Sequence, residues 1–131
     1  MKMIRLLVLG AACWAPLIAQ AGEETLSFGP FGELTVFREN PAPTQVVLFL
    51  SGDGGFNSGV KNMARHLSVQ GALVVGIDIR GFLKAISRSG DKCAYPAADL
   101  EALSQFVQKK FRLPRYIPPI LAGYSSGATL V

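Results

Sequence analysis

The chain has 131 residues, of which half are apolar and 17% are charged, and its formal net charge is +4. This length fits one domain, and the composition is that of a globular protein and excludes an intrinsically disordered chain. The aromatic residues are not interleaved with the basic ones as in nucleic-acid-binding modules, so we expect no nucleic acid partner. With one histidine and no spacing typical of metal ligands, the sequence implies no metal and no organic cofactor.

Residues 1–21 have the pattern of a secretory signal peptide. Lys2 and Arg5 precede an apolar run, and Ala19-Gln20-Ala21 places small residues at the two positions that a signal peptidase inspects. We therefore expect cleavage before Gly22 and export to the periplasm. The alternative is an N-terminal membrane anchor, but the apolar run is interrupted and is shorter than the roughly 20 residues that a membrane span needs.

Cleavage changes both the charge and the cysteine content of the mature chain. Without Lys2 and Arg5, 11 of the 13 basic residues remain against nine acidic ones, so the net charge falls to +2. Cys13 belongs to the removed segment. Cys93 is then the single cysteine, and it is either a free thiol or paired with a residue outside this sequence.

The first half of the mature chain contains a predicted hairpin, two strands and a helix. Residues 25–40 predict two short strands joined by a Gly-Pro turn. The apolar run at 45–50 predicts a strand buried on both faces, which ends in a glycine-rich loop at 51–59. Residues 58–70 have apolar positions at helical spacing. A second buried strand begins at 72 and ends at Asp78.

The second half is predicted to begin with a long loop at residues 80–96, whose length in a compact α/β unit indicates a functional segment. A helix is expected from Pro96 to about Arg112. The basic residues of 109–115 suit the negative end of that helix, with a phosphate-binding patch as the alternative. Residues 116–123 predict a third buried strand, and the residues after Ser126 have the composition of a helix start.

Repeated strand–helix units with short apolar strands predict an α/β fold, with a mainly parallel sheet, helices on both faces and a leading β-hairpin. The last helix has only begun when the sequence reaches Val131. We therefore expect residues 22–131 to be an incomplete α/β-hydrolase-like domain, corresponding to the N-terminal half.

The segment Gly123–Gly127 has the form Gly-x-Ser-x-Gly, the strand-to-helix turn that presents a nucleophilic serine in many hydrolases. Ser125 is the candidate nucleophile, and the backbone N–H of Ser126 is a candidate donor to the oxyanion. In α/β-hydrolases the second donor comes from the loop after an earlier strand. The candidates in that loop are Gly54, Gly55 and Phe56.

The other members of a catalytic triad are not evident in the sequence. In this fold the nucleophile is followed along the chain by the acid and then the histidine. His66 precedes Ser125 and is expected to be a surface or packing residue of its helix. Asp78 also precedes Ser125 and is expected to cap the segment that follows it. We expect the acid and the histidine to lie beyond Val131.

Two other classes of function fit parts of the pattern. Gly52 and Gly54 match the first two glycines of a dinucleotide-binding loop, but the third position holds Asn57, and no Gly-Lys-Ser/Thr follows to make a Walker loop. A non-enzymatic module is the other alternative, in which a helix N-terminus and the amides of the glycine-rich loop hold an anionic group.

Three segments together, VVLFLSGDGGF, GALVVGIDIRGFL and LAGYSSGATLV, resemble the VirJ/AcvB family of bacterial virulence proteins. The resemblance covers most of residues 45–131. It implies an exported α/β-hydrolase-like protein, with Ser125 at the nucleophile position and residues 52–55 as the neighbouring loop. Several members are implied to be periplasmic hydrolases that remove the amino acid from aminoacyl-phosphatidylglycerol, and longer members consist of two hydrolase-like halves.

This resemblance implies a periplasmic serine hydrolase that cleaves an aminoacyl ester of a phospholipid, with a membrane surface as a further contact. A lipid phosphate would suit cationic residues near the site, and the candidates are Arg80, Lys84 and Arg88. The alternative is a non-catalytic hydrolase-like module that binds an anionic lipid or a partner protein. The sequence does not identify a protein partner.

Overall fold

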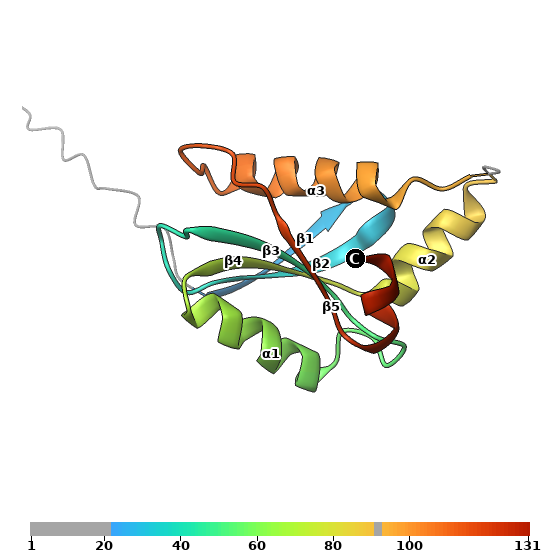
Figure 1. Cartoon of the computed structure of the whole chain (residues 1–131), viewed down its shortest axis with the longest axis horizontal. Coiled ribbons are helices and arrows are strands. Elements are labelled where there is room, and N and C mark those ends of the chain that lie inside the picture. Colours follow the sequence, from blue (N-terminus) through green and yellow to red (C-terminus); the bar gives the residue numbers. More distant parts are fainter. Residues whose placement is uncertain (1–21, 91–92) are drawn as a thin grey trace, which may run out of the picture.

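The computed structural model describes residues 22–90 and 93–131 (Figure 1). The predicted signal peptide lies outside these residues. In the described part, five strands form one sheet in the order β1-β2-β4-β3-β5. The strands are β1 (Gly22–Phe28), β2 (Gly32–Arg38), β3 (Gln45–Leu50), β4 (Ala72–Ile77) and β5 (Ile120–Gly123). The helices are α1 (Ser58–Val69), α2 (Ile79–Arg88) and α3 (Pro96–Lys110), with short 3-10 turns η1 (Gly29–Phe31) and η2 (Ser125–Leu130).

The sheet is mixed, so the prediction of a mainly parallel sheet holds only for its β4-β3-β5 part. In that part β3 pairs in parallel with β4 and with β5. The predicted hairpin is present as β1 and β2, joined by the η1 turn. The difference arises because β2 also pairs with β4, antiparallel, through Leu34–Phe37 and Val74–Ile77. The hairpin thus extends the sheet.

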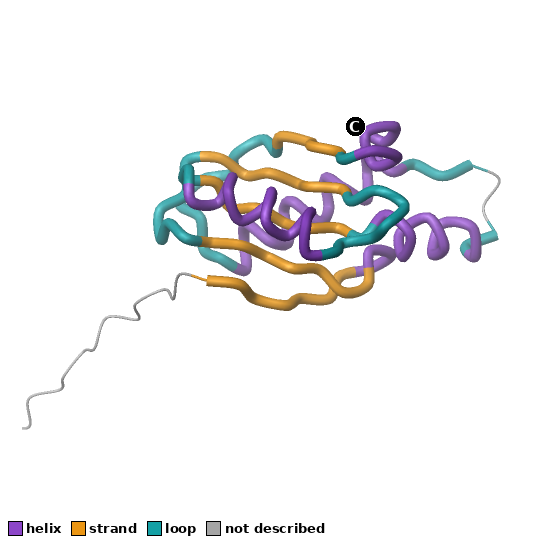
Figure 2. Tube along the Cα trace, turned by 90° about the horizontal axis from the view of Figure 1, so that it is seen from below, coloured by secondary structure: helices purple, strands orange, loops and turns teal. Residues whose placement is uncertain are grey.

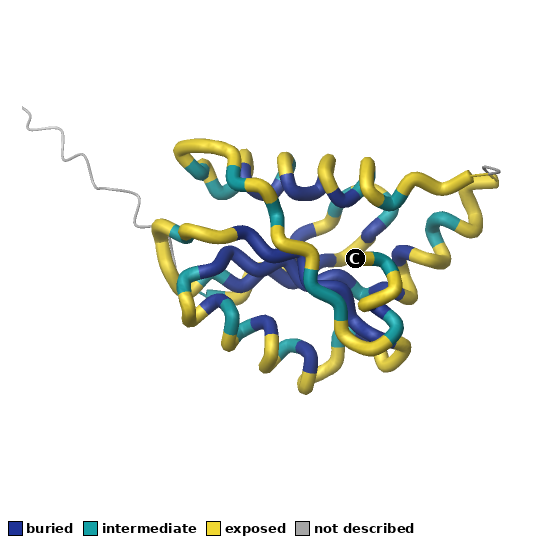
Figure 3. The backbone as a smooth tube through the Cα atoms, viewed as in Figure 1, coloured by how far each residue is buried: buried dark blue, intermediate teal, exposed yellow. Residues whose placement is uncertain are grey.

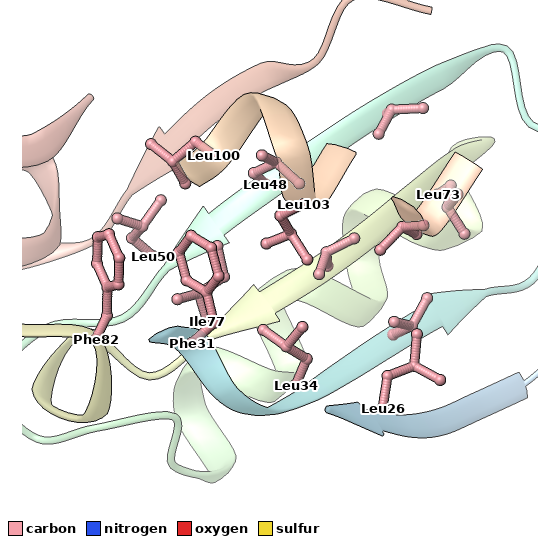
Figure 4. Packing of buried hydrophobic residues seen from close by; sticks show 14 residues of the cluster. Leu26, Phe31, Leu34, Leu48, Leu50, Leu73, Ile77, Phe82, Leu100 and Leu103 are labelled. Carbon is pink, nitrogen blue, oxygen red and sulfur yellow. The ribbon is translucent and has the colours of Figure 1, made fainter. Parts of the chain in front are cut away.

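Helices cover both faces of the sheet, as predicted. α1 lies across one face, where Figure 2 shows it in front of the strands, and α2 and α3 lie on the other side. The core on the side of α3 is the larger one, and Figure 4 shows its leucine, isoleucine and phenylalanine side chains converging from the strands and helices. The core under α1 is centred on Phe37, Phe49 and Val74. These two apolar layers fix the positions of the strand ends.

The central strands are buried as predicted, except for Gln45 at the start of β3, which is exposed. Every residue of β4 is buried (Figure 3). The prediction of a buried third strand is wrong for Ile120 and Leu121, which are exposed. β5 pairs only with β3 among the described strands and is therefore an edge strand. It has four residues because Pro118 and Pro119 before it lack the N–H that a ladder requires.

Most of the predicted loop at 80–96 is helical, since α2 spans Ile79–Arg88. Asp78 begins this helix by accepting a hydrogen bond from the N–H of Arg80 at 3.0 Å. Phe82 is fully buried and its ring stacks on that of Phe31 at 4.3 Å between centroids. The apolar positions Ile79, Phe82 and Ile86 have helical spacing, and this signal was present in the sequence.

The approach to β5 is fastened to α3 by Gln108, which is almost fully buried. Its side-chain amide donates to the carbonyl oxygen of Ile117 at 2.7 Å and accepts from the N–H of Ile117 at 2.8 Å. The same amide donates to Ser104 Oγ at 2.9 Å. These bonds set the direction in which the chain enters β5 and the turn after it.

Candidate functional site

The turn after β5 places Ser125 in a backbone conformation that side chains rarely adopt. Its φ is 54°, in the left-handed region, and it is the first residue of η2. Non-glycine residues in such conformations cost of order 1–3 kcal/mol and persist where the surrounding structure holds them. The hydrogen bond from the N–H of Tyr124 to the carbonyl oxygen of Leu50, at 3.0 Å, anchors the turn to the end of β3.

The two motif glycines occupy positions without space for a side chain. A Cβ atom at Gly123 would lie 2.5 Å from the backbone of Ala128. A Cβ atom at Gly127 would lie 2.6 Å from the carbonyl oxygen of Leu50 and would also collide with that of Ser51. Real Cβ atoms do not approach this closely, so the turn requires glycine at both positions.

The glycine-rich loop between β3 and α1 packs directly against this turn, as the sequence predicts for the loop and Ser125. A Cβ atom at Gly52 would lie 2.9 Å from Ser125 Cβ and 3.4 Å from Ser125 Oγ. The hydroxyl of Ser126 donates to Asp53 Oδ1 at 2.8 Å. A small cavity of about 90 Å³ lies between loop and turn, with Gly52, Asp53, Gly54, Gly55, Asn57, Val60, Tyr124 and Ser125 around it.

The hydrogen bonds of this loop distinguish among the three candidate oxyanion donors. The N–H of Gly55 donates to the carbonyl oxygen of Gly52 at 2.9 Å, which closes a turn. The N–H of Phe56 donates to Asp78 Oδ2 at 3.5 Å. The N–H groups of Gly54 and Ser126 have no acceptor among the described residues. The geometry therefore favours Gly54 in the loop and Ser126 in the turn as donors to a bound anion.

Arg80 and Asp78 hold the far side of the loop. Arg80 donates to Asp78 through Nη2 at 2.8 Å and Nε at 3.1 Å, and its guanidinium lies against Gly55, where φ is 72°. The hydrogen bond from the Arg80 side chain lowers the pKa of Asp78, and the same bond raises the pKa of Arg80. Asp78 is thus a capping residue, as expected, although it caps a helix and not a loop.

Arg80, Lys84 and Arg88 follow one another on one face of α2 and line a groove of about 730 Å³. The opposite wall of the groove is the hairpin turn at 29–33, and Lys61 of α1 contributes another cation. Arg80 is engaged with Asp78. Lys84 and Arg88 are exposed and form no ion pair within the described residues, so they are available to an anionic ligand.

His66 is exposed on α1, as expected of a surface residue, and is not among the residues around the cavity beside Ser125. Asn57 caps α1, because its side-chain oxygen accepts from the N–H groups of Gly59 and Val60 at 3.0 and 3.2 Å. This cap occupies the amides that a dinucleotide phosphate would use, and so disfavours the dinucleotide-binding alternative.

Two residues of the site were not singled out from the sequence. Ser51 is fully buried at the end of β3, and its hydroxyl accepts from the N–H of Ile79 at 3.1 Å, which links β3 to the start of α2. Asp53 contacts Ser126 across the cavity. For Ser51 the signal was a polar residue directly after a buried strand, at the edge where sites form in parallel sheets. For Asp53 the sequence signal was a charged residue within a glycine-rich loop.

The described residues offer neither a paired cysteine nor a candidate metal site. Cys93 is exposed and free in the described part of the chain. Residues 22–90 and 93–131 contain no group of three or more His, Cys, Asp or Glu side chains that could hold a metal ion. Within the same ranges no helix is both long enough and apolar enough to cross a membrane.

The fold and this site define an α/β protein in which a strained serine turn, after a parallel strand, packs against a glycine-rich loop. The sequence model described as "Bacterial virulence protein (VirJ)" matches residues 44–131, well over half of the chain. The chain belongs to the VirJ family of bacterial virulence proteins, which confirms the family resemblance of its three motifs. The match includes β3, the glycine-rich loop and the serine turn. No curated protein and no solved structure matches the chain.

Proposed function

We propose that the protein is a serine ester hydrolase of the bacterial periplasm. The observation that carries the proposal is the left-handed backbone of Ser125, at φ 54°, between β5 and η2 and directly against the loop after β3. In α/β-hydrolases the nucleophilic serine stands on such a strained turn, and the loop after the third strand supplies an oxyanion donor. The arrangement of loop and turn in this chain supports the same division of roles.

In the proposed reaction, Ser125 Oγ gives its proton to a base and attacks the ester carbonyl. The C–O bond to the alcohol then breaks, and the alcohol leaves with that proton. Water hydrolyses the resulting acyl-enzyme, which releases the acid and frees Ser125. The N–H groups of Ser126 and Gly54 stabilise the negative charge that develops on the carbonyl oxygen. The base that takes the proton of Ser125 Oγ is not His66, which lies away from the cavity. The mechanism also needs a general base and an acid that orients it, and the described residues around the cavity do not include a histidine.

The substrate that we propose is the aminoacyl ester of an aminoacylated phospholipid, as the family resemblance implies. Its phosphate would lie in the groove beside α2, where Lys84 and Arg88 are exposed without ion-pair partners among the described residues. Phe56 lines the groove and belongs to the loop that borders Ser125. Arg80 lines the groove from α2 and lies against Gly55 of that loop, so groove and cavity adjoin. Arg80 itself would act mainly by holding the loop through Asp78.

A second candidate function is a non-catalytic module that binds an anionic lipid through the same groove. The pair of unpartnered cations, Lys84 and Arg88, supports it, because anion binding by this groove needs neither Ser125 nor a triad. The hydrolase needs the Ser125 hydroxyl for turnover, whereas the binding module does not. The substitution Ser125→Ala therefore distinguishes the two candidate functions.

The test uses the full-length protein and its Ser125→Ala variant, with release of amino acid from aminoacyl-phosphatidylglycerol vesicles as the activity and labelling by a fluorophosphonate as the second readout. If Ser125 is the nucleophile, activity falls on the order of 10⁴–10⁶-fold and labelling disappears, because nucleophile, acid and base act as a unit. The melting temperature should stay the same, since the side chain is exposed.

The matched control is Ser87→Ala, which removes a hydroxyl that bonds only to the carbonyl of its own helix. It should keep activity and labelling. Unchanged activity in Ser125→Ala would contradict the hydrolase proposal. Vesicle binding that depends on Lys84 and Arg88, with no serine-dependent turnover, would favour the binding module.

A further inference from the structure

Asp53 brings a negative charge to the cavity that contains Ser125. Its Oδ1 accepts from the hydroxyl of Ser126 at 2.8 Å, and its chain neighbour Gly52 touches Ser125. The carboxylate thus contacts the residue that follows the proposed nucleophile, and Asp53 and Ser125 line the same cavity. Asp53 is exposed, and among the described basic side chains none forms an ion pair with it.

This charge is unfavourable for the hydrolysis of a neutral ester. An oxyanion that forms at Ser125 would be repelled by the carboxylate of Asp53, which lines the same cavity, because only backbone N–H groups stabilise the oxyanion there. A positive charge on the substrate, close to its carbonyl carbon, would offset this repulsion. An ammonium group at this place would also donate a charge-assisted hydrogen bond to the carboxylate.

A positive charge that lies this close to the carbonyl carbon would belong to the acyl group of the ester. In an aminoacyl ester the ammonium nitrogen is one carbon away from the carbonyl carbon, so a carbonyl at Ser125 Oγ brings the ammonium next to the cavity wall formed by residues 52–55. Asp53 Oδ1 is held by Ser126, whereas Oδ2 has no hydrogen bond to a described residue. One carboxylate oxygen is thus fixed by the protein and the other is open to a ligand.

We propose that Asp53 determines specificity by selecting esters whose acyl group carries an ammonium close to the carbonyl. This inference rests on the proposed function, because it assumes that Ser125 attacks the ester. It adds to the proposed aminoacyl ester the residue that recognises the ammonium group. Asp53 does not take part in proton transfer; it binds the substrate cation and compensates the charge that develops in the transition state.

The experiment compares two esters of the same alcohol, alanyl and propionyl, which differ only in the ammonium. For the full-length protein, kcat/KM of each ester is divided by its uncatalysed rate, because aminoacyl esters are intrinsically more reactive. The wild type should prefer the alanyl ester by at least about tenfold, the size expected of one hydrogen bond to a charged group. Asp53→Asn should lose this preference through a lower kcat/KM for the alanyl ester.

Asn keeps an oxygen that can accept from Ser126, so this variant removes the charge and leaves the contact between loop and turn. The matched variant Ser126→Ala removes the contact and leaves the charge, and it should retain the preference for the alanyl ester. An equal loss for both esters in Asp53→Asn, or no preference in the wild type, would overturn the role of Asp53 while the hydrolase stands. Absence of Ser125-dependent hydrolysis of any ester would overturn the proposed function and this inference together.

Discussion

Ser125, the proposed nucleophile, has an unfavourable backbone conformation. Its left-handed φ of 54° is shared among the described non-glycine residues only by Arg112, which follows the end of α3. At Arg112 the conformation ends a helix, where the left-handed region is common. At Ser125 it serves no such purpose, and a serine stands where glycine would fit with less strain. This is the pattern expected of a residue retained for its side chain.

Ser125→Gly should therefore raise the free energy of unfolding while removing the proposed activity. Glycine relieves the left-handed strain in the folded state, but it also makes the unfolded chain more flexible. We therefore expect the free energy of unfolding to rise by up to about 1 kcal/mol. Urea denaturation monitored by circular dichroism measures the change. Arg112→Gly is the matched control, with the same relief of strain and full activity. A destabilised Ser125→Gly would contradict this account, since it would mean that the serine side chain holds the turn together.

The sequence was informative about this site where a motif has a fixed local geometry. The Gly-x-Ser-x-Gly turn and the neighbouring glycine-rich loop lie against each other as predicted. The contact of Asp53 with Ser126 could not be predicted, because it joins two segments that are 73 residues apart through single side chains. The role of Arg80 was also missed, because its partner Asp78 becomes apparent only once α2 is known to begin there.

At the scale of elements, α2 is joined to the glycine-rich loop by the carboxylate of Asp78. This group caps α2 through the N–H of Arg80, accepts two bonds from the Arg80 side chain and receives a weak bond from the N–H of Phe56. The hydrogen bond from Arg80 keeps the pKa of Asp78 below its ordinary value of 3.8. A depressed pKa in the folded state means that the carboxylate stabilises the fold above the unfolded pKa and loses this effect as the pH falls through the folded one.

Asp78→Asn should accordingly flatten the pH dependence of stability below about pH 4. Asparagine still caps a helix, so α2 should persist, but the charge that holds Arg80 is lost and the variant should be less stable at neutral pH. The two stability curves should converge in acid. Chemical denaturation at a series of pH values measures this. Asp99→Asn, in the first turn of α3 and without an ion pair to a described residue, is the control. Parallel curves for wild type and Asp78→Asn would refute the expectation.

The elements that the sequence predicted well are those with one strong pattern. β3 and β4 are continuous apolar runs, and α1 and α3 have regular apolar stripes. The prediction of a loop over residues 80–96 is wrong for α2, which packs against the hairpin turn η1 through the buried ring of Phe82 on Phe31. The pairing of β2 with β4 is a long-range contact, and no local pattern in the hairpin indicates it.

At the scale of the whole molecule, we expect signal peptidase to cut before Gly22, and the hairpin of β1 and β2 lies wholly after this position. Export should therefore leave the hairpin intact. Protein recovered from the periplasm should have Gly22 as its first residue in N-terminal sequencing. Replacing Ala21 with a bulky residue should block cleavage, whereas the same change at Gln20 should not. An intact Met1 on membrane-bound protein would support the anchor instead.

The exposed edge of the sheet is a second property of the molecule as a whole. Ile120, Leu121 and Tyr124 are each between 39% and 49% exposed on or beside β5. Unpaired edges with apolar side chains tend to associate with other strands. Purification of this chain should accordingly include a check of its association state before any rate is assigned to it.

The pairing of β5 with β3 also has a consequence for the order of folding. Val47 pairs with Ile120, so the ladder between β3 and β5 joins residues that are far apart in the sequence. Bringing such residues together costs chain entropy, and pairings of this kind form slowly. The strained turn at Ser125 depends on that ladder through Tyr124 and Leu50. A chain emerging from a translocon would complete its hairpin and α1 early and assemble the serine turn last. Pulsed hydrogen exchange would then show protection at Val75 before Leu121, and the turn that carries the proposed nucleophile would form only in molecules whose sheet is already assembled.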